Sequence, residues 1–274
     1  MTLSTNKAVG IIPARWGSTR FPGKLLHPIA GKPLLKHVWD RCRRAKNLDL
    51  VVIATDDMRI ASAAFDWGAE VALTSPKHGS GTDRAAEVAS KAEQFAYVIN
   101  IQGDEALIDP RLIDKLVEKL RLDRKVGIVT AAHPFKNPED AFSPHQVKVV
   151  LDLRGKALYF SRAAIPAPRN GGAVALASSR SNPSAQMPMP RGRRSLFLRH
   201  QGIYGFRRET LLQFVRWKPS PLECAESLEQ LRALENGVKV HVLVTATGSP
   251  GIDTPEDATA LEQKLARAKR RMRA

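Results

Sequence analysis

The stretch AVGIIPARWGSTRFPGK, Ala8–Lys24, joins a short apolar run to a loop that is rich in cationic side chains. The first five residues have the length and the near-continuous apolar character of a strand buried on both faces. Ligands of open parallel sheets bind beyond the carboxyl ends of the strands, so the loop is the first candidate for an anion site. Its cations and hydroxyls are Arg15, Ser18, Thr19, Arg20 and Lys24.

Strand-like runs alternate with helical patterns through the rest of the first half. This alternation predicts an α/β fold, with a Rossmann-like, mixed and mainly parallel sheet and helices on both faces. The expected strands are 50–55, 70–74 and 97–102, and the expected helices are 33–46, 57–67, 82–94 and 110–120.

The second half has more strands and fewer helices, which indicates an antiparallel or mixed extension of the sheet. In the helix expected at 222–236, leucines and one alanine recur every third residue and predict a buried stripe. The other elements expected here are strands at 126–132, 147–151, 158–160, 198–206 and 238–245, and helices at 208–216 and from Pro255.

We expect one domain, 1–274, with two peripheral segments. The loop 167–197 is rich in Gly, Pro, Ser and Ala without a period, a composition that predicts a flexible loop. The tail 264–274 is strongly basic. Much of the formal net charge of +16 lies in such peripheral runs, which favours solvated surface charge over a dedicated binding face.

Several classes of protein are disfavoured by the sequence. It has no zinc-finger spacing, aromatic RNP pattern or heptad zipper, so no specific binding of nucleic acid is expected. It has no apolar run that suits a signal peptide or a membrane span, so we expect a soluble cytoplasmic protein without membrane insertion.

The opening loop fits neither of two familiar phosphate fingerprints. Gly17 and Gly23 are one residue too far apart for a Walker loop, and Leu25 replaces the hydroxyl that should follow Lys24. A dinucleotide G-x-G-x-x-G is absent as well. A long loop with arginine forks and a lysine suits a polyphosphate, although an ordinary basic loop remains an even alternative.

Two acidic motifs could supply ligands for a polyphosphate-bound cation. INIQGDE, 99–105, ends a strand with Gln102 and Asp104, and one or two carboxylates are what Mg²⁺ uses beside phosphates. The alternative is a plain turn after the strand. In GIDTPED, Thr254 and Pro255 form a helix start, a task in which Asp253 has no part.

Two other segments contain polar residues at positions that can be structural or functional. HGSGTDR precedes a helix, so Ser80 or Thr82 is first a candidate cap, while the glycines around Ser80 permit a flat ligand to approach the backbone. LRHQGIYGF, as a strand, places His200 and Tyr204 on one face. A lone histidine is more often structural than functional.

These motifs, taken in order, resemble the 3-deoxy-manno-octulosonate (Kdo) cytidylyltransferase, or CMP-Kdo synthetase, family of sugar-activating enzymes. The resemblance also covers ATDD, VKVVLD, ALYFSRAAIP and PSPLECAESLEQLR, and so spans nearly the whole chain. The family typically reads QGDEP where this chain has Ala106 in place of proline. The resemblance implies a nucleotide-diphospho-sugar transferase fold, CTP and Kdo as substrates, Mg²⁺, and a homodimer that serves lipopolysaccharide synthesis.

The resemblance also implies residue roles. It assigns catalysis to Arg15, Lys24, Asp104 and Asp253, with the two aspartates as metal ligands. It assigns CTP binding to Arg15, Ser18, Thr19, Arg20, Lys24, Ser80, Gly81, Thr82 and Gln102. Within this set, it assigns the cytosine base and the ribose to the HGSGTDR segment together with Gln102. It assigns sugar binding to Arg162, His200, Tyr204, Glu229 and Gln230. Neighbouring interpretations are a cytidylyltransferase for sialic acid or 8-amino-Kdo, and a non-catalytic polyanion-binding protein.

Overall fold

The computed structural model describes residues 6–17, 20–167 and 197–271. Most of the predicted loop 167–197 and the last residues of the basic tail therefore lie outside the described part of the chain. The chain divides into two compact units. Unit 1 contains Met1–Leu122, Ile203–Val215 and Ser249–Ala274, and unit 2 contains Asp123–Gly202 and Arg216–Gly248.

The strands of unit 1 form a mainly parallel sheet around β1 (Lys7–Ala14). This strand pairs in parallel with β4 (Leu50–Thr55) on one side and with β6 (Phe95–Asn100) on the other. Ile11 and Ile12 point to opposite faces, and both are fully buried, so both faces of the sheet are covered. Beyond these strands, β5 (Glu70–Leu73) pairs in parallel with β4, and the second half of β10 (Leu198–Arg207) pairs antiparallel with β6.

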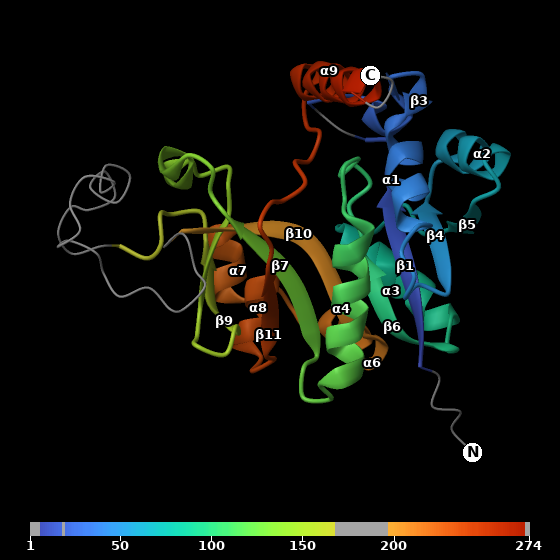
Figure 1. Cartoon of the computed structure of the whole chain (residues 1–274). Coiled ribbons are helices and arrows are strands. Elements are labelled where there is room, and N and C mark those ends of the chain that lie inside the picture. The colour runs from blue at the N-terminus through green and yellow to red at the C-terminus, as the bar shows by residue number, and fades with distance from the viewer. Residues whose placement is uncertain (1–5, 18–19, 168–196, 272–274) are drawn as a thin grey trace. The chain divides into compact units, whose positions relative to one another are not determined.

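Helices of unit 1 cover this sheet and cluster in two pairs (Figure 1). α1 (Leu34–Cys42) contacts α4 (Pro110–Leu122), and α3 (Gly81–Lys91) contacts α6 (Arg208–Phe214). α2 (Met58–Asp66) packs on β4 and β5. Each of these helices begins within two residues of its expected position.

A small hairpin in unit 1 was not expected from the sequence. Its strands are β2 (Pro28–Ile29) and β3 (Lys32–Pro33), and they follow the short 3-10 helix η1 (Lys24–Leu26). The C-terminal helix α9 (Pro255–Arg271) lies against it, as Figure 1 shows, and Glu262 accepts a hydrogen bond from the Ala30 N–H at 2.8 Å. The hairpin thereby ties the end of the chain to its beginning.

Unit 2 has a parallel and an antiparallel part. β7 (Ile128–Pro134) runs parallel to β11 (Val240–Val244), while β8 (Lys148–Leu151) is antiparallel to β9 (Ala157–Ser161) and to the first half of β10. Its helical segments are η2 (Pro138–Phe142), α7 (Pro221–Glu226) and α8 (Gln230–Glu235). The predicted mixed, mainly parallel α/β architecture is confirmed.

The single helix expected at 222–236 is wrong. The structure has α7 and α8 in its place, separated by Ser227 in a left-handed conformation with φ of 52°. A capping box between Ser220 and Glu223 starts α7, and the break changes the direction in which its side chains face. Leu228 and Leu231 are buried as expected, whereas Leu222 is 39% exposed and does not belong to a buried stripe.

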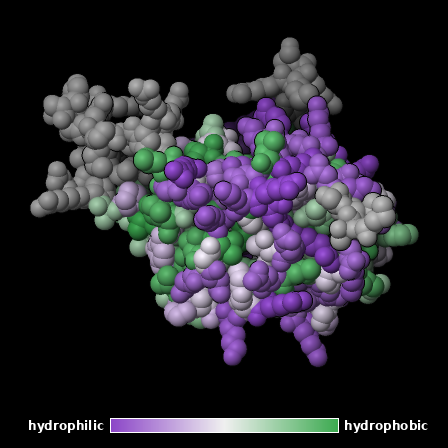
Figure 2. Space-filling model, turned by 90° about the horizontal axis from the view of Figure 1, so that it is seen from below, coloured by the Kyte–Doolittle hydropathy of each residue, from purple (hydrophilic) through white to green (hydrophobic). Residues whose placement is uncertain are grey.

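The surface agrees with the charged composition. Hydrophilic residues, in purple, predominate on the face shown in Figure 2, and hydrophobic residues, in green, form smaller groups. Within the described ranges, none of the helices combines the length and the apolar character that a membrane span requires.

Candidate functional site

Lys24 is the centre of an ion cluster in unit 1. Its ammonium donates to Asp104 Oδ2 at 2.6 Å, to the Ile252 carbonyl at 3.0 Å and to Asp253 Oδ1 at 3.2 Å. Arg20 adds a second cation, with Nη2 at 3.1 Å from Asp253 Oδ1. The cationic loop and the two aspartates, which lie far apart in the sequence, therefore meet in the fold.

Close packing around Gly103 fixes the position of Asp104. A Cβ atom on Gly103 would lie 3.2 Å from the Pro13 carbonyl oxygen and 3.3 Å from the Leu25 side chain, so only glycine fits here without a shift. Ile252 N–H donates to the Asp104 carbonyl at 3.1 Å. The turn after β6 is thus held between β1, η1 and the segment that carries Asp253.

Asp253 is positioned by the start of α9. Thr254 caps the helix by accepting from Asp257 N–H at 3.3 Å, and Asp257 accepts in return from the main chain of Asp253 and Thr254 at 2.9 and 3.0 Å. This confirms the predicted helix start. The cap uses the main chain of Asp253 and leaves its carboxylate to Lys24 and Arg20.

The HGSGTDR segment is a helix start that also borders β1. Ser80 and Asp83 form a capping box at the beginning of α3, with Asp83 N–H donating to Ser80 Oγ at 3.1 Å. Thr82 is buried, and its hydroxyl accepts from Asn100 at 3.4 Å. A Cβ atom on Gly81 would be in ordinary contact with Pro13, at 3.4 Å. The segment therefore lies at the same edge of the sheet as Gly103.

The remaining nucleotide-binding candidates occupy the same edge or lie outside the described residues. Arg15 is exposed directly after β1, and Gln102 is half-buried shortly after β6. Ser18 and Thr19 fall in the part of the chain that the structure does not describe.

A stacked pair that was not predicted from the sequence involves Trp16 at the start of the opening loop. The Arg59 guanidinium lies 3.6 Å from the centre of the Trp16 ring and is held by Asp57 through Nε at 3.0 Å and Nη2 at 2.6 Å. A Cβ atom on Gly23, which has φ of 67°, would come within 3.1 Å of the same ring. The sequence feature that could have indicated this pair is Arg59 itself, which lies two residues after the second aspartate of ATDD.

His200 in unit 2 is held as a neutral ring. His200 is partly exposed as a residue, but its ring lies among protein atoms, and this desolvation lowers the pKa of His200 from its ordinary value to about 3. Nε2 lies 2.9 Å from the Thr130 hydroxyl, and the edge of the ring packs against Phe160 with centroids 5.0 Å apart. At neutral pH this histidine offers hydrogen bonds and no charge.

The depressed pKa of His200 predicts a pH-dependent stability. The unfolded chain binds a proton at this histidine below about pH 6.5, whereas the native ring resists protonation down to about pH 3. Stability is therefore lost as the pH falls below 6.5. Between pH 7 and pH 5, the wild type should lose up to about 2 kcal/mol more free energy of unfolding than H200Q. Urea titrations at both pH values measure this difference.

The exposed His145 supplies the matched control, since H145Q should follow the wild type at both pH values. Equal losses in the wild type and in H200Q would show that His200 is protonated as readily in the native state as in the unfolded chain.

Arg162 is anchored at the end of β9. Its guanidinium donates through Nε to the Glu226 carbonyl at 2.8 Å and through Nη1 to the Pro144 carbonyl at 3.2 Å, and its own N–H donates to the Glu226 carboxylate at 2.8 Å. The fully buried Lys148 donates to the Arg162 carbonyl. These contacts show a structural task for Arg162, and its assignment to a sugar carboxylate stays a prediction.

The other residues assigned to the sugar are divided between the two units. Gln230 is buried at the first turn of α8 and Glu229 is its half-buried N-cap residue, both in unit 2. Tyr204 belongs to unit 1, where it pairs with Asn100 of β6. Along β10 the expected alternation is present, because Gln201, Ile203 and Gly205 are buried while His200 and Tyr204 are partly exposed. Their roles toward a sugar stay predictions.

Comparison with known proteins identifies the family. A cytidylyltransferase family model matches residues 9–240. Two proteins named 3-deoxy-manno-octulosonate cytidylyltransferase are similar to this chain. The one from Geobacter metallireducens is 43% identical and aligned over 95% of this chain and 98% of the relative, and the one from Pseudomonas syringae pv. tomato is 46% identical over 93% and 96%.

Solved structures show the same relationship. One described as CMP:2-keto-3-deoxy-manno-octonic acid synthetase complexed with CTP has a TM-score of 0.84 and 37% identity, and the match covers 96% of this chain and 99% of the other. A cytidylyltransferase from Leptospira borgpetersenii, 18% identical with a TM-score of 0.60 over 95% of this chain and 87% of the other, shares the fold. The resemblance found in the sequence is confirmed, and the chain belongs to the 3-deoxy-manno-octulosonate cytidylyltransferase family.

Proposed function

We propose that this protein transfers the cytidylyl group of CTP to 3-deoxy-D-manno-octulosonate, giving CMP-Kdo and pyrophosphate. The names of the similar proteins support the substrates, as does the CTP complex of the solved relative. The observation in this chain that carries the proposal is the meeting of Lys24 with Asp104 and Asp253. It assembles the charges that a triphosphate and its counter-ion require.

In the proposed reaction, the anomeric hydroxyl oxygen of Kdo attacks the α-phosphorus of CTP. A bond forms between these two atoms, the bond from the α-phosphorus to the bridging oxygen breaks, and pyrophosphate leaves, while the proton of the hydroxyl passes to solvent. Such transfers depend on positioning and charge neutralisation more than on covalent help from the protein. Arg15, Arg20 and Lys24 supply the positive charge, and no residue is assigned as a general base.

We further propose that Asp104 and Asp253 hold Mg²⁺. Carboxylate oxygens are ligands that Mg²⁺ favours, and these two already share one cation, the ammonium of Lys24. When bound, the metal would neutralise charge on the α-phosphate and lower the pKa of the attacking hydroxyl. Arg20 and Lys24 would bind the triphosphate, and Lys24 would exchange one of its present contacts for a phosphate oxygen.

The acceptor is assigned to His200, Tyr204, Glu229, Gln230 and Arg162. A neutral His200 and the Tyr204 hydroxyl would recognise sugar hydroxyls by hydrogen bonds, which reject analogues that cannot make them. The carboxylate of the sugar acid is assigned to Arg162, whose guanidinium would have to bind it in addition to the main-chain carbonyls.

The test is a panel of sugar acids with CTP and Mg²⁺, with pyrophosphate release as the measurement. We expect release with Kdo and CTP together, and little with sialic acid or 8-amino-Kdo. Turnover with either of these in preference to Kdo would reassign the acceptor. Salt-sensitive binding of DNA without any CTP-dependent turnover would favour the alternative of a non-catalytic polyanion-binding protein, a class that a net charge of +16 would also suit.

Three wider expectations belong to the same proposal and rest on the family. The product would serve lipopolysaccharide synthesis, the reaction would take place in the cytoplasm, and the protein would be a homodimer. Light scattering on the purified protein measures the last of these directly.

A further inference from the structure

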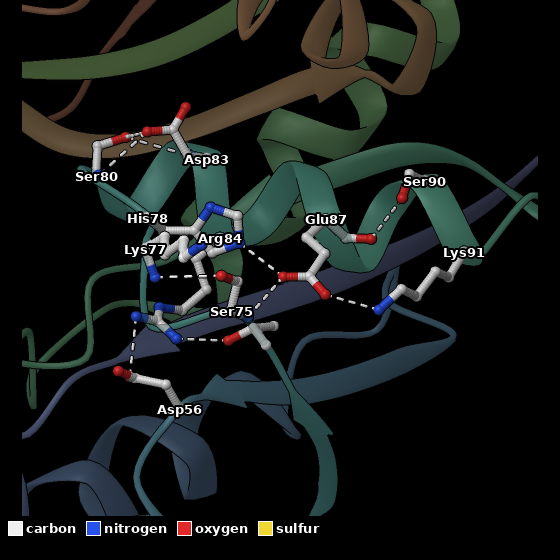
Figure 3. A network of polar contacts seen from close by, with 11 residues as sticks. Asp56, Ser75, Lys77, His78, Ser80, Asp83, Arg84, Glu87, Ser90 and Lys91 are labelled. Atoms are coloured by element: carbon white, nitrogen blue, oxygen red, sulfur yellow. Dashed lines mark hydrogen bonds and ion pairs between the residues drawn. The ribbon is translucent and has the colours of Figure 1, made fainter.

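Arg84 of α3 ties together two loops that follow neighbouring strands (Figure 3). Its side chain is 5% exposed and donates to the Thr74 hydroxyl and, through Nη2 at 2.9 Å, to Asp56 Oδ1. Thr74 follows β5 and Asp56 follows β4. Because a buried guanidinium that loses its partners is costly, Arg84 holds both loops in fixed places.

Glu87, one turn further along α3, holds the next part of the same segment. Its carboxylate accepts from the Ser75 N–H at 2.9 Å, from His78 Nε2 at 2.6 Å and from Lys91 Nζ at 2.7 Å. The hydrogen bond from Lys91, followed by those from Ser75 and His78, lowers the pKa of Glu87 to about 2, so the carboxylate stays charged at neutral pH. Figure 3 shows these contacts on one side of the helix.

The two side chains fix a segment that has left the sheet. β5 ends at Leu73, and after one further main-chain hydrogen bond, from Thr74 N–H to the Thr55 carbonyl at 2.9 Å, the chain runs to Ser80 outside any strand. Arg84 and Glu87 anchor Thr74, Ser75 and His78, and the Ser80 capping box anchors the other end. The helix that follows this segment, α3, therefore holds it in place.

We propose that Arg84 and Glu87 are positioning residues that fix the base-reading segment Thr74–Thr82 and so set the preference for cytosine over uracil. This inference rests on the proposed function and on the family resemblance, which assigns Ser80, Gly81 and Thr82 to the nucleotide. Cytosine and uracil differ in the donor or acceptor at one ring edge, and hydrogen bonds weaken steeply with misalignment. Loosening the segment should therefore cost selectivity.

The test compares dissociation constants of CTP and UTP, measured by calorimetry, in wild type, R84K and E87Q. Lysine keeps the charge of Arg84 but lacks the fork that reaches two partners, and glutamine keeps the shape of Glu87 without its charge. We expect the CTP/UTP affinity ratio to fall at least about tenfold in both variants, with KM for CTP rising more than kcat falls.

Two matched variants separate this role from general stability. Arg208 donates to the Ala89 and Ser90 carbonyls at 2.8 and 3.1 Å, at the other end of α3, so R208K perturbs the same helix away from the segment. K91M removes the partner of Glu87 that is 68% exposed. Both should keep the wild-type ratio, whatever their effect on urea unfolding.

The possible outcomes are distinct. A wild type without preference for CTP would overturn the proposed function itself. A wild type that prefers CTP, with unchanged ratios in R84K and E87Q, would overturn only the positioning role. If R84K fails to fold, E87Q alone decides. The Glu87 side chain is 22% exposed and its partner Lys91 is 68% exposed, so this substitution leaves no deeply buried charge unpaired.

Discussion

Replacing Asp104 with Asn is expected to lower kcat/KM at least about 10³-fold, a loss of about 4 kcal/mol in transition-state stabilisation. Asparagine keeps the shape of the side chain but removes the charge that faces Lys24 Nζ at 2.6 Å. It also removes one of the two carboxylates proposed to hold Mg²⁺. Steady-state pyrophosphate release with CTP and Kdo measures the effect.

Asp109 provides the control for this substitution. It lies shortly after Asp104, accepts from Arg111 N–H at 3.0 Å and is followed by α4, and asparagine caps helices as well as aspartate does. D109N should therefore keep near-wild-type kinetics. H200N should cost far less turnover than D104N, because His200 is assigned to binding and not to charge neutralisation. The reverse order would contradict the proposed mechanism.

The sheet of unit 1 was the part of the fold most open to prediction. β1, β4, β5 and β6 are short apolar runs bounded by turn signals, and their two-sided burial leaves a continuous apolar pattern in the sequence. The hairpin of β2 and β3 was missed because two-residue strands have no period to detect.

The break between α7 and α8 shows where periodicity fails. Leucines and one alanine recur every third residue across it. Nevertheless, Ser227 adopts a left-handed conformation, and the Glu226 carboxylate accepts from the main-chain N–H of Arg162. The contact is made between residues far apart in the chain, so a local pattern carries no sign of it. Tertiary hydrogen bonds here override a favourable helical pattern.

The candidate site was predictable in parts. The cationic loop and Asp104 follow apolar strands, and topology alone brings such loops to one sheet edge. Asp253 follows no strand of the parallel core, and its closeness to Lys24 and Asp104 was expected only through the family resemblance. Arg84 and Glu87 were missed because charged residues on a helix are usually solvated, and nothing in their spacing shows that one is buried.

The contacts of Lys24 suggest why a divalent cation and the nucleotide should bind together. An ammonium has three donors, and Asp104, Asp253 and the Ile252 carbonyl accept one each. A phosphate oxygen can therefore reach Lys24 only if one of these bonds is given up. The metal is expected at the carboxylates that Lys24 then releases.

Substituting Lys24 with Met should accordingly have two opposite effects. It should lower kcat/KM for CTP at least about 10²-fold, because a charge that contacts the triphosphate is lost. It should also strengthen binding of Mn²⁺ in the absence of nucleotide, by about tenfold or more, because Asp104 and Asp253 lose the cation that neutralises them. Electron paramagnetic resonance of free Mn²⁺ measures the second effect without any turnover.

Lys32 offers a matched control, since it forms an ion pair with Asp40 at 2.6 Å and is 48% exposed. K32M removes the same charge a few residues away, and exposed ion pairs contribute little, so both CTP kinetics and Mn²⁺ binding should stay close to wild type. If K24M binds Mn²⁺ no better than K32M does, the two aspartates do not act as one cation site. The loss of turnover in K24M would then report phosphate binding alone, and the assignment of Mg²⁺ to Asp104 and Asp253 would be wrong.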